Sequence, residues 1–497
     1  MHHGDRRRRH ELRIAVVEDA RCDALADELG LEAVAVPPLL LALAARDQAP
    51  VPRFAHLDLE GAGAEFACRL REVPLGLARP YWEADPDFDV GYHLRRIAVP
   101  SPGGMRELVD LCGFLFSQKL DRRRPLWELW YIEGVEGGRA ALFSKTHHSL
   151  MDGVKGADLS AVLCDLEPHP APRPAPEPRP RANPADSRGT LGLAVEGILN
   201  AALTPARIAS YSVQALLRGV RMAPYLLGAD ASPIGAALPR LSFNGEIGPR
   251  RGFACASVPM ADVRALKDAL GVKLNDVFVE LSAAAMRRYL EKRGEPSGES
   301  LAVACAVSTR SEGDTTANRL ATMVVSCAGD VADPVERVRK IHENANRAKE
   351  MTAKIRSTPI ASLGEVLPPS LVNLGFRTLL ALAEWTPLPT HALVSNVPGP
   401  PVPLYLAGAR IEGIYPFSIL ASSQGLNVTV FSFMDRVDFG FTVDPDLVPD
   451  AWSLAEGIAP ALEELLEAAE QHTGWSFVRR ELAPDLDAGD ARASVAA

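Results

Sequence analysis

The chain has 497 residues, a formal net charge of −10, and 47% hydrophobic and 23% charged residues. A single hydrophobic core seldom serves a chain of this length, so the sequence predicts two domains. The acidic balance excludes nucleic acid as a partner attracted by bulk charge, and it disfavours attraction to membranes by the same means.

The seven cysteines are scattered, odd in number and never spaced as CxxC. This pattern predicts reduced thiols in a cytoplasmic protein, with neither a disulfide framework nor a metal site. The basic first ten residues are not followed by the apolar run of a signal peptide. No stretch of about 18 uninterrupted apolar residues occurs, so we expect no membrane-spanning helix.

The first clear elements mix helix and strand. Apolar residues at helical spacing predict a helix around Met105–Leu115. A strand over Leu126–Val135 and another over Ala140–Lys145 follow, joined by a turn at Gly137-Gly138. From Met151 to Leu166 the apolar spacing is helical again.

Eight prolines fall between residues 168 and 184. Because proline fixes the backbone torsion and removes a donor, this stretch predicts an extended, semi-rigid linker between separate sheets. The apolar, alanine-rich stretch Leu191–Leu227 then predicts two helices, broken near Thr204-Pro205. These helices suit either a membrane surface or an ordinary core, and both interpretations stay open.

The C-terminal part repeats the mixture of strands and helices. Its predicted strands are Phe253–Val258, Leu301–Val307, Thr322–Cys327, Leu426–Met434 and Val437–Val443. Its predicted helices are Ala261–Leu270, Asp276–Leu290, Pro334–Lys349 and Trp452–Ala469. The tight turn at Asp435-Arg436 indicates antiparallel pairing. The fold class is therefore mixed α/β (α+β), and not a doubly wound parallel sheet.

These observations predict six segments. They are a divergent N-terminal segment (1–55), a first domain (56–167), the proline-rich linker (168–190), apolar connecting helices (191–235), a second domain (236–475) and a disordered tail (476–497).

The candidate site is the run His147-His148-Ser149-Leu150-Met151-Asp152-Gly153, where a strand pattern gives way to a helix pattern. An imidazole can take a proton from an alcohol near neutral pH, which activates the hydroxyl for direct attack on a thioester. Asp152 is suited to orient the turn through a charge pair, and Gly153 permits close backbone approach. Metal binding is the weaker interpretation, because the spacing differs from HExxH, and Asp152 would also suit a helix cap.

The run fits the HHxxxDG signature of the coenzyme A-dependent acyltransferase superfamily. Five further motifs, in order along the chain, resemble the bacterial wax ester synthase/diacylglycerol acyltransferase family. The motifs are Arg79–Trp82 with Asp85–Asp89, PLW at Pro125–Trp127, NGxIGxxRR at Asn244–Arg251, ND at Asn275-Asp276, and SNVPGP at Ser395–Pro400. The family's usual opening motif has no counterpart in residues 1–55.

The resemblance implies two chloramphenicol acetyltransferase-like domains with a tunnel at their interface. His148 would be the general base, with His147 beside it in a mainly structural role. Asp152 would pair with an arginine of the second domain, for which Arg310 is the candidate. The supporting residues would be Gly153, Asn275, Asp276, Ser395 and Asn396.

Each supporting motif also has a purely structural interpretation. Asn275 and Asp276 suit the first turn of a helix as capping residues. Ser395–Pro400 suits a rigid loop after a strand. Trp127 is typical of a core residue, and the arginines of the run Arg122–Arg124 suit a surface turn as well as coenzyme A phosphates.

By resemblance, the function is transfer of a long-chain acyl group from acyl-coenzyme A to diacylglycerol or a long-chain alcohol, giving triacylglycerol or wax ester. Acyl-coenzyme A is a substrate, and no cofactor is expected. The alternatives are a condensation-type acyltransferase that uses a carrier-protein thioester and a non-catalytic lipid-binding relative. We expect a cytoplasmic protein with peripheral contact to the inner face of the plasma membrane or to lipid inclusions.

Overall fold

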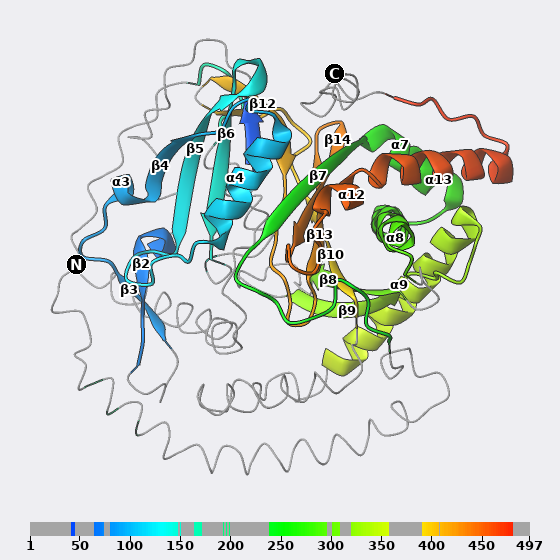
Figure 1. Cartoon of the computed structure of the whole chain (residues 1–497), viewed down its shortest axis with the longest axis horizontal. Coiled ribbons are helices and arrows are strands. Elements are labelled where there is room, and N and C mark those ends of the chain that lie inside the picture. Colours follow the sequence, from blue (N-terminus) through cyan, green and yellow to red (C-terminus); the bar gives the residue numbers. More distant parts are fainter. Residues whose placement is uncertain are drawn as a thin grey trace, which may run out of the picture.

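The computed structural model describes residues 41–44, 64–73, 80–147, 150, 164–170, 192, 195, 198, 238–295, 301–308, 320–356, 390–406 and 408–480. Within these ranges the chain forms two six-stranded sheets and one two-stranded sheet (Figure 1). The predicted mixed α/β class is confirmed. Most of the proline-rich linker and of the apolar stretch after it lies outside the described residues.

The first sheet is built mostly from the N-terminal third of the chain. Its order is β11 (Tyr405–Leu406), β12 (Ala409–Tyr415), β1 (Leu41–Ala44), β6 (Arg139–Thr146), β5 (Trp127–Val135) and β4 (Leu94–Ala98). The predicted hairpin of β5 and β6 is confirmed, and Gly137 at its turn has a φ of +73° that favours glycine. β1 lies in the segment predicted to be divergent, and it pairs with both β6 and β12.

One helix packs against this sheet and joins it to the second. The helix α4 (Met105–Ser117) buries Leu108, Val109 and Cys112, as its apolar spacing predicts. A Cβ at Gly113 would lie 2.9 Å from the carbonyl oxygen of Arg251, so the glycine permits close approach to the start of the second sheet.

The second sheet holds all five predicted C-terminal strands and one that was missed. Its order is β7 (Gly252–Pro259), β14 (Arg436–Val443), β13 (Leu426–Phe433), β10 (Ala392–Pro398), β8 (Ala302–Ser308) and β9 (Leu320–Ser326). The missed strand, β10, pairs in parallel with both β13 and β8. The composition of Ser395–Pro400 is typical of a turn, and it hides the fact that the strand continues to Pro398.

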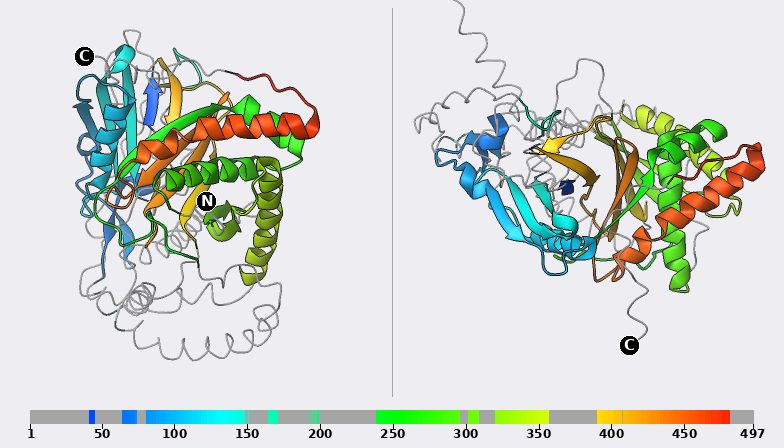
Figure 2. Two further views of the ribbon diagram at one scale, coloured as in Figure 1. Left: turned by 45° about the vertical axis from the view of Figure 1, so that its right-hand side comes forward. Right: turned by 90° about the horizontal axis from the view of Figure 1, so that it is seen from above.

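Helices cover the face of the second sheet that points away from the first (Figure 2). They are α7 (Met260–Leu270), α8 (Leu274–Lys292), α9 (Pro334–Arg356), α12 (Ala451–Ala455) and α13 (Ile458–Thr473). The prediction of one helix over Trp452–Ala469 is wrong, because the chain breaks at Glu456-Gly457. A Cβ at Gly457 would lie 3.1 Å from the Cα of Ala285, so the break lets the chain pass close to α8.

Alternation along the strands of the second sheet separates two environments. Val437, Phe439 and Phe441 of β14 point into the core under the helices. The intervening Arg436 and Asp438 point to the other face, toward the first sheet, and both are buried. The interface between the two sheets is therefore partly polar.

The two sheets share a crossing segment. β12 belongs to the first sheet, and the chain after it runs over β14, where a Cβ at Gly440 would lie 1.4 Å from the carbonyl oxygen of Pro416. The expectation of separate sheets on either side of the linker is therefore wrong for β11 and β12. Hydrogen bonds to side chains of β14 hold β12 across the interface, as with Ile414 N–H, which donates to Asp438 at 3.3 Å. The domain boundaries themselves remain a prediction.

The remaining described elements are small. They are η2 (Ala64–Ala67), β2 (Cys68–Arg71), β3 (Tyr81–Ala84), α3 (Val90–His93) and η4 (Glu136–Gly138). None of the six described cysteines forms a disulfide. Among the described helices, none has the length and apolar composition needed to cross a bilayer.

Most of the helix predicted over Met151–Leu166 lies outside the described residues. Its last residues are described and are not helical, because Asp165 forms an antiparallel bridge with Tyr405. The backbone N–H of Asp165 donates to the carbonyl oxygen of Tyr405 at 2.8 Å. This bridge attaches the end of the N-terminal part to β11.

We predict that Gly440→Ala destabilises the protein severely, because its methyl group would overlap the Pro416 carbonyl. The measurement is the thermal unfolding midpoint of the purified full chain. Gly192→Ala is the control, since a Cβ at this helical, exposed glycine would meet nothing within 4 Å. A Gly440→Ala protein as stable as the wild type would contradict the close crossing of the two segments.

Candidate active site

The candidate site begins at the end of β6. The backbone N–H of His147 donates to the carbonyl oxygen of Leu126 at 2.9 Å, and its own carbonyl accepts from Leu150 N–H at 3.0 Å. The side chains of His147 and Leu150 are both buried. His148, Asp152 and Gly153, like Arg310, lie outside the described residues.

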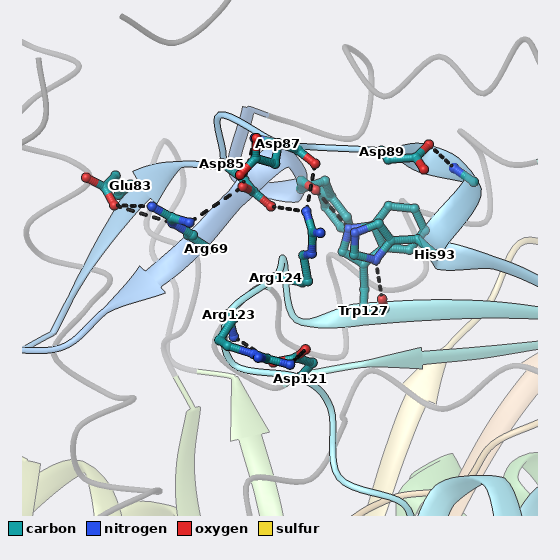
Figure 3. Close-up of polar contacts among 12 residues, drawn as sticks. Arg69, Glu83, Asp85, Asp87, Asp89, His93, Asp121, Arg123, Arg124 and Trp127 are labelled. Carbon is teal, nitrogen blue, oxygen red and sulfur yellow. Dashed lines mark hydrogen bonds and ion pairs between the residues drawn. The ribbon is translucent and has the colours of Figure 1, made fainter. Parts of the chain in front are cut away.

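Trp127 of the PLW motif is a core residue, as its structural interpretation predicts. Its indole N–H donates to the carbonyl oxygen of Phe66 at 2.8 Å, and His93 stacks on it at 4.4 Å between ring centroids (Figure 3). His93 Nδ1–H donates to the carbonyl oxygen of Trp127 at 2.7 Å. Burial lowers the pKa of His93, so the ring is neutral and serves to hold the tryptophan.

The arginines of the run Arg122–Arg124 are paired within the chain, and Figure 3 shows the contacts of Arg123 and Arg124. Arg122 contacts Glu72 at 2.8 Å and Arg123 contacts Asp121 at 2.8 Å. Arg124 donates to the carbonyl oxygen of Asp87 at 2.7 Å. These contacts favour the surface-turn interpretation over a phosphate-binding one.

Lys145 lies two residues before His147 and was not predicted to matter. Its ammonium group is buried and donates to the carbonyl oxygen of Leu115 at 3.0 Å and to that of Gln118. Both oxygens belong to the C-terminal end of α4, where the helix dipole favours a positive charge. The lysine therefore ties α4 to the strand that leads into the histidine motif.

The ND motif lies in the first turn of α8. The cap residue is Lys273, so the expectation that Asn275 caps the helix is wrong. Asp276 does act on the helix end, because its carboxylate accepts from the backbone N–H of Lys273 at 2.9 Å. Its carboxylate also contacts the imidazole of His342 at 2.5 Å, a partner that the sequence did not indicate.

The SNVPGP motif spans the end of β10 and the turn after it. Val394 is buried in the core under the helices, whereas Val397 is buried between the two sheets. By alternation Ser395 shares the inter-sheet face, and Asn396 lies on the helix face. A Cβ at Gly399 would lie 2.2 Å from the carbonyl oxygen of Ser432, which explains the glycine at this turn.

Two buried clusters bring the motifs together around β10. The cluster between the sheets contains Leu126 of PLW, Leu150 of HHxxxDG and Val397 of SNVPGP. The cluster under the helices contains Val277, next to the ND motif, together with Val394. Parts of the PLW, HHxxxDG and SNVPGP motifs therefore share the buried cluster between the sheets, and this shared cluster defines the candidate site. The residue next to the ND motif packs on the other face of the second sheet.

The NGxIGxxRR motif is structural. Asn244 donates to the carbonyl oxygen of His391 at 2.8 Å, and Gly248 N–H donates to the buried carboxylate of Asp444 at 2.5 Å. The backbone N–H of Arg251 donates to the hydroxyl of Ser117 at 2.9 Å. These bonds attach the segment before β7 to α4 and to the ends of β10 and β14.

No group of three or more histidine, cysteine or acidic side chains among the described residues could hold a metal ion. The described part of the site consists of buried apolar residues with few polar groups.

The two joined sheets define the class of protein, a two-domain acyltransferase of the chloramphenicol acetyltransferase type. The first condensation domain of the calcium-dependent antibiotic synthetase shares this fold, with a TM-score of 0.53 and 15% identity over 95% of this chain and 97% of that one. The wax ester synthase/diacylglycerol acyltransferase from Marinobacter aquaeolei is more similar. Its TM-score is 0.60 and its identity 26%, over 88% of this chain and 96% of that one.

The chain belongs to the wax ester synthase/diacylglycerol acyltransferase family and is an acyltransferase. The family's catalytic-domain model matches residues 43–278, and its C-terminal-domain model matches residues 316–466. A putative diacylglycerol O-acyltransferase of Mycobacterium tuberculosis is 35% identical over 82% of this chain and 81% of its own length. The match to the catalytic-domain model begins at residue 43, inside β1 and inside the segment that was predicted to be divergent.

We predict that Lys145 makes the free energy of unfolding depend on pH in the alkaline range. Burial lowers its pKa from an ordinary 10.5 to about 8, so between these values the unfolded chain binds more protons than the folded protein. The free energy of unfolding should therefore rise with pH in that window, relative to Lys145→Met, by up to about 3 kcal/mol.

Urea unfolding of both proteins at pH 7, 8, 9 and 10 measures this difference. Lys340→Met is the control, because Lys340 is half-exposed and pairs with the exposed Glu343. A stability difference between wild type and Lys145→Met that stays constant with pH would contradict the burial of a charged lysine at the end of α4.

Proposed function

We propose that the protein transfers a long-chain acyl group from acyl-coenzyme A to diacylglycerol, and also to long-chain alcohols, forming triacylglycerol or wax ester. The observation that carries the proposal is the HHxxxDG run, residues 147–153, at the end of β6. Its described members His147 and Leu150 are buried, and Leu150 lies in the same buried cluster as Val397 of the SNVPGP motif. Curated relatives named as diacylglycerol O-acyltransferases support the choice of acceptor.

In this reaction His148 acts as the general base. It removes the proton of the acceptor hydroxyl while the oxygen attacks the thioester carbonyl. The tetrahedral oxyanion is stabilised by aimed hydrogen-bond donors, each typically worth about 3 kcal/mol, and the side-chain amide of Asn275 is our candidate. The attack forms the new carbon–oxygen bond, and collapse of the intermediate restores the carbonyl and breaks the carbon–sulfur bond. His148 then returns the proton to the departing thiolate, and free coenzyme A leaves.

The other motif residues orient this base. His147 is buried and structural, Gly153 lets the backbone approach closely, and Asp152 pairs with a cation of the second domain, for which Arg310 is our candidate. Ser395 and Asn396 stand on opposite faces of β10. We assign Ser395 to the wall of a substrate tunnel between the domains and Asn396 to the support of α8.

We predict that His148→Ala lowers the rate of coenzyme A release about 10²–10⁴-fold, because general-base help is typically worth that much. His147→Ala should cost less, and Asp152→Ala should lose activity through disorder of the turn. The assay uses the purified full chain with palmitoyl-coenzyme A and either dioleoylglycerol or hexadecanol. His169→Ala is the matched control, since this exposed histidine lies outside the motif.

A His148→Ala protein with the wild-type rate would contradict the mechanism. A wild-type protein that releases no coenzyme A with either acceptor, yet acylates from a carrier-protein thioester, would favour the condensation-type alternative. A protein that binds both lipids without turnover would favour the lipid-binding alternative.

We also propose a cytoplasmic location with peripheral contact to lipid, at the inner face of the plasma membrane or on lipid inclusions. Support comes from Val195 and Ile198 in the apolar stretch Leu191–Leu227, because both are helical and their side chains are 50% and 59% exposed. An apolar helix face next to water is typical of an interfacial helix.

We predict that replacing both exposed residues (Val195→Asp with Ile198→Asp) weakens binding to phosphatidylcholine vesicles that contain dioleoylglycerol. Neutral vesicles are chosen because the chain carries a net charge of −10. Vesicle flotation is the measurement. Val478→Asp is the control, because Val478 is an exposed apolar residue in another part of the chain. Equal flotation of the double variant and the wild type would favour the core-helix interpretation.

A further inference from the structure

Four polar residues form a continuous chain of hydrogen bonds between the first turn of α8 and the side of α9. Lys273 Nζ donates to Asn346 Oδ1 at 2.6 Å, and Asn346 Nδ2 contacts His342 Nε2 at 2.9 Å. His342 Nδ1 contacts the Asp276 carboxylate at 2.5 Å. The same carboxylate oxygen accepts from the backbone N–H of Lys273 at 2.9 Å, which closes the network.

The direction of these bonds follows from which groups can only donate. The Lys273 ammonium has no lone pair, so the Asn346 oxygen accepts from it and the Asn346 amide nitrogen faces His342. His342 Nε2 must therefore accept, and its Nδ1–H must donate to Asp276. The imidazole is held as one neutral tautomer, with its donor aimed at the carboxylate.

Burial makes this donor important to Asp276. The aspartate side chain is 2% exposed, whereas that of His342 is 27% exposed. A buried carboxylate that loses a hydrogen-bond donor bears a desolvation cost that water does not repay. Without His342, the described contacts leave the backbone N–H of Lys273 as the donor to Asp276.

The first turn of α8 also lies against the strands that meet at the candidate site. Burial raises the pKa of Cys305 on β8, and the nearby charge of Asp276 adds to this shift. Cys305 is the register partner of Val394 on β10, which directly precedes the SNVPGP motif. A shift of this turn would therefore move Asn275 relative to the end of β10.

We propose that His342 is a positioning residue for acyl transfer. It holds Asp276 so that the first turn of α8 presents Asn275 at a fixed place beside the acyl group, without touching substrate itself. The inference rests on the proposed function, in which the Asn275 amide stabilises the thioester oxyanion.

Loss of His342 should act locally, because α8 and α9 are joined elsewhere. Arg337 of α9 donates to the buried carboxylate of Glu280 at 2.8 Å, one turn further along α8. Asn344 of α9 donates to the carbonyl oxygen of Ser326 at 3.1 Å, at the end of β9. Asn344→Ala is therefore a matched control that removes a contact of α9 which does not reach Asp276.

The test compares three replacements of His342 in the full chain. Asparagine places an amide N–H near the position of Nδ1 and keeps the donor to Asp276. Glutamine places it near Nε2, and leucine removes it. We expect kcat to fall about 10–100-fold in His342→Leu and His342→Gln, with KM for palmitoyl-coenzyme A changed less than about 3-fold. His342→Asn should recover most of kcat, and Asn344→Ala should keep it.

A double-mutant cycle identifies the route of the effect. If His342 acts through Asn275, then adding His342→Leu to Asn275→Ala should cause no further loss of kcat. Additive losses of kcat in the double variant would overturn the proposal. Wild-type kcat in both His342→Leu and His342→Gln would also overturn it. So would equal losses of kcat in His342→Leu and Asn344→Ala. If the leucine variant does not fold, the contrast between asparagine and glutamine decides.

Failure of the proposed function would look different. It would appear as a wild-type protein that releases no coenzyme A. Amide hydrogen exchange over residues 274–278 then still reports on the positioning role. Faster exchange in His342→Gln than in Asn344→Ala would support it, and equal exchange would overturn it.

Discussion

The buried ion pair of Arg436 and Asp438 is the interaction on which the rest of the structure depends. Asp438 accepts from Arg436 at 2.8 Å on the inter-sheet face of β14. The guanidinium also donates to the Ser257 hydroxyl at 2.6 Å, the Tyr415 hydroxyl at 3.1 Å and the carbonyl oxygen of Glu412 at 3.2 Å. A buried pair seldom adds net stability over apolar residues, but loss of one partner costs about 3–5 kcal/mol. The main effect of the pair is therefore to specify where β12 passes over β14. Its net contribution to the stability of the fold is smaller.

That crossing determines where the site forms. β12 belongs to the first sheet, yet its backbone and Tyr415 are bonded to side chains of the second. Because Gly440 has no side chain, the backbone at Pro416 can pass directly over β14. The crossing segment therefore holds the first sheet against the second. The end of β6 and the end of β10 consequently share one buried cluster. A site formed in this way has its parts on strands of two sheets, which restricts their relative movement.

The sequence predicted those parts of the fold whose signal is local. The hairpin of β5 and β6 and the helices α4, α7, α8 and α9 follow from apolar periodicity and glycine turns. β10 was missed because Ser, Asn and Pro in its second half are typical of turns. Its extended conformation is stabilised by parallel pairing with β13 and β8, which the local sequence does not indicate. β11 has only two residues, and the place of β12 in the first sheet depends on β1, more than 250 positions earlier in the chain.

The same distinction separates the histidines. The HHxxxDG run could be predicted because its chemistry imposes a pattern within seven residues. His93, His342 and His391 carry no such pattern, and their contacts reveal their roles. His391 accepts from Ala302 N–H at 3.1 Å and contacts the carbonyl oxygen of Pro239 at 2.9 Å, so its ring is held in one orientation. The ring of His93 is held in the same way by the carbonyl oxygen of Trp127. Burial lowers the pKa of both rings, so neither is suited to take a proton from a substrate. Their contacts support the framework, and neither ring takes part in the proton transfer that we propose for His148.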